Sequence, residues 1–214
     1  MIRVVIADDQ DMVRAGFRMI LDAAEGIEVV AEASNGRDAV TKALHLRPDV
    51  CLFDIRMPEL DGIAATELIA GADVEAPLKV VVITTFDLDE YVYGALQAGA
   101  LGFLLKNAGP ELLIAAIRAA ADGDSLISPE ITTRLLAHIV VPDAQPPPDE
   151  NPLTERENEV VAVVARGLSN AEVANELHVS ISTVKAHVAG AMAKLGARNR
   201  VELVIWAYEH GLTG

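Results

Sequence analysis

Five polar side chains in the N-terminal half of the chain stand at or just beyond the ends of apolar runs. Short apolar runs bounded by turn residues indicate buried strands of a parallel sheet. Open α/β sheets bind ligands at the carboxyl ends of their strands, so these side chains are predicted to share one edge of a sheet. The five residues are Asp8, Asp9, Asp54, Thr84 and Lys106.

Three of these side chains are carboxylates, and their predicted proximity has an electrostatic cost. At roughly 5 Å, each pair of like charges costs about 3 kcal/mol at an effective dielectric constant of 20. A cation offsets this cost, and carboxylates with a backbone carbonyl and water suit Mg²⁺. The nearby hydroxyl of Thr84 and ammonium of Lys106 add groups that bind a tetrahedral anion. The pattern therefore predicts a site for a tetrahedral anion held by a metal ion.

Each of these residues also has an ordinary structural interpretation. Asp54 could be a helix cap or a solvated turn residue, because Pro58 and Asp61-Gly62 turn the chain shortly after it. Asp8 could cap the first helix, and Lys106 could be a solvated lysine at a strand end. These alternatives stay open when each residue is taken alone.

The elements that must position these residues alternate between strands and helices. β-Branched and apolar runs predict five strands, at 2–7, 27–33, 50–53, 78–83 and 101–105. Helical spacing and start signals predict five helices, at 12–23, 36–46, 63–70, 88–98 and 110–121. This alternation predicts right-handed βαβ units and a doubly wound parallel sheet with helices on both faces.

A proline-rich segment separates this α/β region from a helical one. After a helix predicted from Ser128 to about Val140, residues 141–152 lack periodicity and contain three consecutive prolines, which is typical of a semi-rigid linker. Four short helices follow, each with a start signal. The signals are the pairs Thr154/Glu157, Ser169/Glu172 and Asn199/Glu202, and Ser180. We therefore predict domains at 1–124 and 151–214, joined by a helix and linker at 125–150.

The net charge of −15 argues against a wholly basic nucleic-acid-binding protein. Residues 1–125 carry a net charge of −11, whereas 151–214 carry −1 and include an acid-free stretch at 180–200. No apolar run reaches the length of a membrane span, and the N-terminus begins a strand pattern in place of a signal peptide. The chain has one cysteine, Cys51, within an apolar run, which indicates a buried thiol and fits the cytoplasm.

Residues 169–195 have the pattern of a helix, a short turn and a second helix. The second helix has an apolar stripe made of Val184, Val188, Met192 and Leu195. Its opposite face carries one lysine and small residues, which fits the major groove of DNA. The residues of that face are Ser182, Lys185, Ala186 and Ala189.

Residues 1–122 resemble the receiver domain of two-component response regulators. The resemblance rests on Asp8-Asp9, on Asp54 in Asp-Ile-Arg-Met-Pro-Glu-Leu-Asp-Gly, on Thr84 in Val-Ile-Thr-Thr-Phe and on Lys106 in Gly-Phe-Leu-Leu-Lys. It implies a flavodoxin-like (βα)5 fold in which Asp54 accepts a phosphoryl group from a phosphohistidine of a sensor histidine kinase. It also implies that Asp8, Asp9, Asp54 and the carbonyl of Arg56 hold Mg²⁺.

The same resemblance gives roles to the remaining residues of the edge. Lys106 would bind the phosphoryl product, and Thr84 would donate a hydrogen bond to it. Phe103 occupies the position of the family's switch aromatic and would turn in behind Thr84. Asn107 is a departure, because many receivers have a proline in a cis peptide there.

The stretch from Leu153 to Tyr208 resembles the four-helix DNA-binding domain of the LuxR/NarL type. The motifs are Leu-Thr-Glu-Arg-Glu, Gly-Leu-Ser-Asn-Ala-Glu-Val-Ala, Ser-Thr-Val-Lys-Ala-His-Val and Lys-Leu-Gly-Ala-Arg. The resemblance places 182–195 in the major groove of promoter DNA and a homodimer contact on the last helix. Lys185 and Ala186 are then candidates for base contacts. Candidates for phosphate contacts are Thr183, Lys194, Arg198 and Arg200.

Three functions fit these patterns. The first is a phosphorylation-switched transcription factor, with no enzymatic activity beyond its own Mg²⁺-dependent phosphorylation and dephosphorylation. The second is a metal-dependent phosphohydrolase, although such enzymes usually have an acid two residues after the first aspartate, where this chain has Gln10. The third is a receiver-like interaction module that never takes phosphate.

Overall fold

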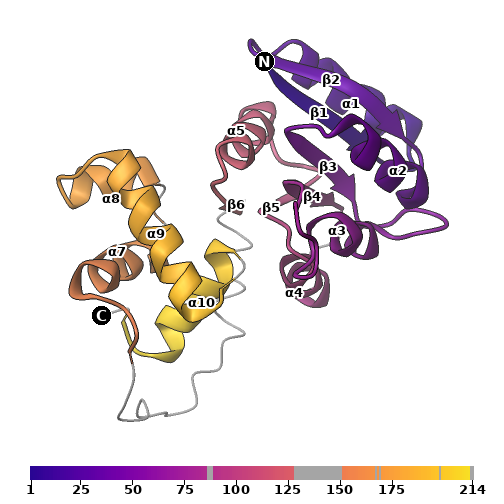
Figure 1. The fold of residues 1–214 in the computed structure, drawn as a ribbon. Coiled ribbons are helices and arrows are strands. Elements are labelled where there is room, and N and C mark those ends of the chain that lie inside the picture. The colour runs from indigo at the N-terminus through magenta and orange to yellow at the C-terminus, as the bar shows by residue number, and fades with distance from the viewer. Residues whose placement is uncertain (86–88, 128–150, 167, 169, 198, 213–214) are drawn as a thin grey trace. The chain divides into compact units, whose positions relative to one another are not determined.

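The apolar runs of the N-terminal region form a six-stranded sheet in the computed structural model, which describes residues 1–85, 89–127, 151–166, 168, 170–197 and 199–212. The strand order is β2-β1-β3-β4-β5-β6, and all the neighbouring pairs are parallel (Figure 1). The strands are β1 (Ile2–Ala7), β2 (Ile27–Ala33), β3 (Val50–Asp54), β4 (Val80–Thr84), β5 (Gly102–Leu105) and β6 (Leu126–Ile127). The helices between them are α1 (Asp11–Asp22), α2 (Gly36–Leu46), α3 (Gly62–Ala70), α4 (Asp89–Gln97) and α5 (Pro110–Ala121).

The sheet has one strand more than the sequence predicted. Strand β6 pairs with β5 through Leu126 and Gly102. It lies at the start of the segment 125–150, for which the sequence predicts a helix and a linker. Two residues are too few to give a period-two pattern, so this strand has no signal in the sequence. The helix predicted from Ser128 to Val140 and the proline-rich linker lie outside the described residues.

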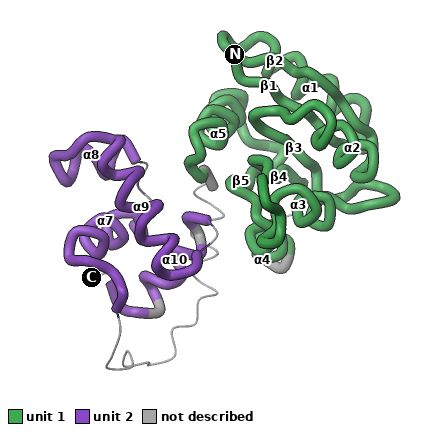
Figure 2. Tube along the Cα trace, in the orientation of Figure 1, with its two compact units in different colours: residues 1–131 green, residues 132–214 purple. Residues whose placement is uncertain are grey.

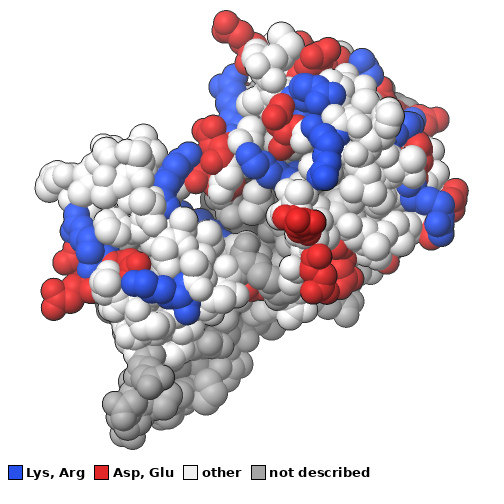
Figure 3. All heavy atoms as spheres, in the orientation of Figure 1, with Lys and Arg blue, Asp and Glu red and all other residues white. Residues whose placement is uncertain are grey.

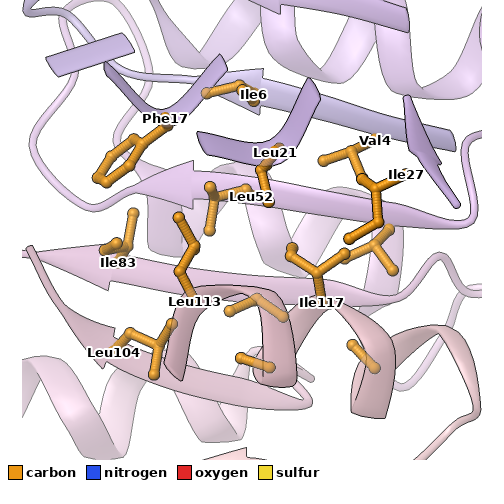
Figure 4. Packing of buried hydrophobic residues seen from close by; sticks show 14 of the residues in the cluster. Val4, Ile6, Phe17, Leu21, Ile27, Leu52, Ile83, Leu104, Leu113 and Ile117 are labelled. Atoms are coloured by element: carbon orange, nitrogen blue, oxygen red, sulfur yellow. The ribbon is translucent and has the colours of Figure 1, made fainter. Parts of the chain in front are cut away.

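Both faces of the sheet are covered, as predicted for a doubly wound fold. Phe17 and Leu21 of α1 pack with Leu113 and Ile117 of α5 on one face (Figure 4). Alternate strand residues outside this cluster, such as Val5, are also fully buried, because α2, α3 and α4 pack on the other face. A sheet buried on both faces holds its strand ends, and the side chains that follow them, in fixed positions.

Local signals start the helices that flank the sheet edge. The side chain of Asn35 caps α2 by accepting a hydrogen bond from the Asp38 N–H, at 2.8 Å. Asp61 caps α3 in the same way, through the Ala64 N–H at 2.8 Å. In both caps, a short polar side chain before an apolar stripe satisfies an otherwise unpaired N–H group of the first turn.

The chain divides into two compact units, Met1–Ile131 and Thr132–Gly214 (Figure 2). Their border falls within the segment 125–150 that the sequence assigned to the connection. The second unit contains α7 (Glu155–Ala165), α8 (Asn170–Glu176), α9 (Ile181–Leu195) and α10 (Arg200–Glu209), the four predicted helices.

On the visible face, basic and acidic side chains lie next to each other in each unit (Figure 3). None of the described helices has the length and apolar character needed to cross a membrane.

The core of the second unit is an apolar cluster to which all four helices contribute. Val160 of α7, Val173 of α8, Val184 of α9 and Leu203 of α10 are fully buried in it. Thr154 caps α7 in a complete capping box with Glu157, and Ser180 caps α9 through the Thr183 N–H, at 3.1 Å. These caps match the start signals predicted from the sequence.

Candidate functional site

The register of two neighbouring strands brings the predicted carboxylates together. Ala7 at the end of β1 pairs with Phe53 of β3, so Asp8 and Asp54, the next residues along each strand, lie side by side. In this strand order, β2 lies on one side of β1, whereas β3 and the later strands lie on the other side. The order of the strands therefore reverses between β1 and β3. Ligands bind at such a topological switch point in open α/β sheets.

Asp8, Asp9 and Asp54 each offer a carboxylate oxygen, and these oxygens lie within 4.8 Å of one another. Asp8 and Asp54 are buried, whereas Asp9 is exposed. One oxygen of Asp8, Oδ1, accepts a hydrogen bond from the Gln10 N–H at 2.9 Å. Its other oxygen, Oδ2, is buried and accepts no hydrogen bond of acceptable geometry. A buried carboxylate oxygen that has no well-formed hydrogen bond and whose nearby cation is the ammonium of Lys106, beside two further carboxylates, fits the oxygen ligand set of Mg²⁺.

Lys106 supplies positive charge to this cluster. Its Nζ lies 2.7 Å from Asp8 Oδ2 and 3.0 Å from Asp54 Oδ2, and its side chain is only 7% exposed. Burial raises the pKa of Asp54 to about 6, with a further increase from the charge of Asp8, although Lys106 acts against both. The prediction that Lys106 shares an edge with the carboxylates is correct, and its ammonium contacts two of them directly.

Thr84 and Phe103 lie on the strands that complete this edge. Thr84 ends β4 and is 1% exposed, and its carbonyl accepts a hydrogen bond from the Lys106 N–H at 2.8 Å. Phe103 is fully buried on β5, opposite Val82. Their roles as phosphoryl ligand and switch aromatic remain predictions.

Arg56 lies in the loop between β3 and α3. Its guanidinium donates a hydrogen bond to the Tyr91 hydroxyl at 3.2 Å and lies 5.8 Å from the centre of that ring. Together with Asp9, Met57 and other residues, these two side chains line an open cleft of about 600 Å³ beside the carboxylates. The use of the Arg56 carbonyl as a metal ligand stays a prediction.

The peptide bond that precedes Asn107, where many receivers have a cis proline, is trans.

Gly62 is a residue whose importance the sequence analysis missed. Its N–H donates to the Ile55 carbonyl at 2.8 Å, and a Cβ at this position would lie 1.9 Å from the carbonyl oxygen of Asp54. Only glycine allows α3 to approach the end of β3 so closely. The pair Asp61-Gly62 was recognised as a turn signal, but the contact with Asp54 depends on tertiary packing.

Arg14 of α1 is a second residue that the sequence analysis missed. Its Nη1 donates a hydrogen bond to the backbone carbonyl of Asp8 at 2.7 Å. No motif identifies it, because an arginine in the first turns of a helix is ordinarily a surface residue.

Helices α8 and α9 form the predicted helix-turn-helix. Val184 and Val188 of α9 are buried, and Met192 and Leu195 pack against the same core, as the stripe predicted. On the opposite face, Ser182, Ala186 and Ala189 are exposed and Lys185 is half-buried. The open face of α9 therefore presents small side chains and one lysine, with Thr183 next to them in a hydroxyl contact of 2.7 Å with Ser180.

Lys194 and Arg200, predicted to contact phosphates, have partners within the domain. Lys194 Nζ donates to Glu157 Oε2 at 2.6 Å, and a Cβ on Gly190 would lie 3.0 Å from the other oxygen of Glu157. Gly190 within α9 thus leaves space for this carboxylate. Arg200 donates to the Asn170 side chain at 2.7 Å and to the Leu168 carbonyl. These contacts were missed by the sequence analysis, and DNA contact by either residue stays a prediction. Arg198 lies outside the described residues.

Comparisons with known proteins agree with this division of the chain. Residues 4–118 match the response regulator receiver domain, and residues 151–207 match the luxR family of bacterial regulatory proteins. The uncharacterized transcriptional regulatory protein YxjL of Bacillus subtilis is 40% identical over 213 residues, which cover 99% of this chain and 97% of YxjL. The oxygen regulatory protein NreC of Staphylococcus aureus is 39% identical over 215 residues, covering 98% of each chain.

Two solved structures are similar over nearly the whole chain. The response regulator ChrA, from a heme-sensing two-component system, has 37% identity and a TM-score of 0.54 and covers 99% of this chain and 98% of its own. The response regulator RcsB in complex with DNA has 28% identity and a TM-score of 0.56, with coverage of 97% and 98%. The fold and the carboxylate site define a receiver joined to a helix-turn-helix domain. The chain belongs to the LuxR-type family of transcriptional response regulators.

Proposed function

We propose that this protein is switched by phosphorylation of Asp54 and that the switch controls dimerisation and promoter binding. The observation that carries the proposal is the ion pair of Asp54 with Lys106, beside Asp8 and Asp9, at the switch point of the sheet. A carboxylate is largely ionised at neutral pH and can act as a nucleophile without a base.

In the proposed reaction, an oxygen of Asp54 attacks the phosphorus of a phosphohistidine on a sensor kinase. The P–N bond breaks as the new P–O bond forms, and the leaving imidazole takes a proton from water and departs as the neutral ring. Asp8, Asp9, Asp54 and the Arg56 carbonyl would hold Mg²⁺, which offsets repulsion between the carboxylate and the phosphoryl oxygens. Lys106 then pairs with the phosphoryl oxygens, and Thr84 donates a hydrogen bond to one of them.

Phosphorylation can act on DNA binding only if the phosphoryl group binds one conformation of the receiver better than the other. In the proposed active conformation, two chains pair and present two α9 helices to successive half-sites of double-stranded DNA. We propose that the protein acts in the cytoplasm, where the kinase output and the promoter are both accessible, and that it has no catalytic turnover beyond its own phosphorylation state.

The test measures the mass of the intact protein after incubation with acetyl phosphate and Mg²⁺, for the wild type and Asp54→Asn. We expect one added phosphoryl group on the wild type and none on the variant. Gel shifts of the same samples on DNA selected from a random library should show tighter binding only for the phosphorylated protein. Absence of label on the wild type would contradict the proposal, and steady hydrolysis of a small phosphate ester would favour a phosphohydrolase.

A further inference from the structure

The peptide that joins the two predicted metal ligands Asp8 and Asp9 is held by a side chain from α1. Arg14 Nη1 donates to the Asp8 carbonyl oxygen at 2.7 Å. The Asp8 N–H donates to Ala33 at the end of β2, at 3.1 Å. Both polar groups of the Asp8 backbone are therefore bonded to other elements, and the Arg14 contact fixes the plane of the Asp8–Asp9 peptide.

Arg14 is itself held in one orientation by two carboxylates. Its Nε pairs with Glu32 of β2 at 3.1 Å, and its Nη2 pairs with Asp11 at the start of α1 at 2.6 Å. The Arg14 side chain is 15% exposed. All three nitrogens of the guanidinium are thus engaged, one on the Asp8 carbonyl and two on side chains of flanking elements, a use that suits the planar fork of arginine.

This support matters because the other contacts of Asp8 reach its side chain and its N–H. The Gln10 N–H donates to Asp8 Oδ1 at 2.9 Å, and Lys106 Nζ lies 2.7 Å from Asp8 Oδ2, but neither contact holds the Asp8 carbonyl. Gln10, the residue before α1, makes no side-chain cap. Asp9 is exposed. The contact from Arg14 is therefore a main constraint on the direction in which the Asp9 side chain leaves the backbone.

We propose that Arg14 is a positioning residue for divalent-cation binding, which acts by fixing the backbone between Asp8 and Asp9. The proposal rests on the proposed function, since it takes Asp8 and Asp9 to hold Mg²⁺. Residues that orient metal ligands typically change metal affinity by about 10–100-fold when they are removed.

Electrostatics alone predicts the opposite sign. Removal of a positive charge near a carboxylate cluster strengthens the attraction of Mg²⁺ for that cluster. Arg18 provides a matched control, because its guanidinium pairs with the same Glu32, at 2.6 Å, and with Asp22, but contacts no atom of Asp8 in the described structure. Arg14→Ala and Arg18→Ala remove the same charge from the same helix, and only the first removes the support of the loop.

The test titrates Mg²⁺ into the full-length protein by isothermal titration calorimetry for the wild type, Arg14→Ala, Arg14→Lys and Arg18→Ala. We expect the Kd for Mg²⁺ to rise about 10-fold in Arg14→Ala, less in Arg14→Lys, and to stay level or fall in Arg18→Ala. Labelling by acetyl phosphate in Arg14→Ala should recover when Mg²⁺ is raised in proportion to the new Kd. Circular dichroism checks folding, and Arg14→Lys decides the matter if Arg14→Ala does not fold.

The outcomes separate this inference from the function on which it rests. If the wild type binds no Mg²⁺, the proposed function fails together with the inference. If the wild type binds Mg²⁺ and Arg14→Ala and Arg14→Lys bind it as tightly as Arg18→Ala, the positioning role is overturned while the proposed function stands.

Discussion

The ammonium of Lys106 lies 2.7 Å from Oδ2 of Asp8, and both side chains are almost fully buried. Removing one partner of a buried ion pair costs about 3–5 kcal/mol, because it leaves the other charge uncompensated. We expect Lys106→Ala to lower the free energy of unfolding of the metal-free protein by this amount, measured by urea unfolding followed by circular dichroism. Saturating Mg²⁺ should raise the free energy of unfolding more in Lys106→Ala than in the wild type, since the ion then supplies the missing charge.

A double-mutant cycle provides the control for this pair. In an Asp8→Asn background, Lys106→Ala should cost less than in the wild type, because fewer buried negative charges lose their partner. Equal costs in the two backgrounds would contradict a direct stabilising interaction between Lys106 and Asp8.

The close approach of Gly62 to Asp54 predicts an unusually large effect for the addition of one methyl group. A Cβ at Gly62 would lie 1.9 Å from the Asp54 carbonyl oxygen, whereas a Cβ at Gly16 in α1 would meet no atom within 4 Å. We expect Gly62→Ala to destabilise the receiver by about 1–3 kcal/mol and to slow labelling of Asp54. Gly16→Ala should stabilise it by about 0.5–1 kcal/mol. Urea unfolding and intact mass measure the two effects, and similar values for both variants would refute the steric argument.

The pair Glu157 and Lys194 predicts a stability of the second unit that depends on pH. The hydrogen bonds from Lys194 and Thr154 lower the pKa of Glu157 from 4.5 to about 2. A folded-state pKa below that of the unfolded chain gives stability that is present above pH 4.5 and is lost as the pH falls toward 2. We therefore expect the Tm of the wild type to exceed that of Glu157→Gln near pH 7, and this difference to shrink on acidification.

The fluorescence of Trp206 measures this effect in the relevant unit, because Trp206 is the one tryptophan of the chain and lies in α10. Glu159→Gln is the control, since its carboxylate pairs with Arg156 at a more exposed site. A Tm difference that is constant from neutral to acidic pH for Glu157→Gln would argue against the assigned pKa shift.

Lys185 and Lys194 lie on the same helix, but their contacts predict different consequences of substitution. Lys185 belongs to the open face of α9, so Lys185→Ala is expected to cost about 1–3 kcal/mol of binding to a selected duplex, and much less on a random duplex. Lys194 pairs with a buried carboxylate, at 2.6 Å, so Lys194→Ala is expected mainly to lower the Tm of the second unit. Fluorescence anisotropy and Trp206 unfolding separate the two effects. An unchanged Tm together with weaker DNA binding in Lys194→Ala would assign this lysine to DNA instead.

Much of the architecture was predictable from the sequence because its signals are local. Helical spacing, strand composition and caps such as Asn35 and Asp61 depend on residues a few positions apart, and the described residues contain the strands and helices predicted within them. The carboxylates and Lys106 could be assigned to one edge for the same reason, since each stands at the end of an apolar run. What the sequence could not show was a strand too short for periodicity, β6.

Tertiary structure alone decided which groups touch at that edge and in the second unit. The pairing of Ala7 with Phe53 places Asp8 beside Asp54. The packing of α1 brings Arg14 to the Asp8 carbonyl. The packing of α7 on α9 brings Lys194 within hydrogen-bond distance of Glu157. These contacts join residues brought together by burial of apolar surface across the sheet and among the helices. That driving force is non-directional, so it leaves no local pattern in the chain from which such pairs could be inferred.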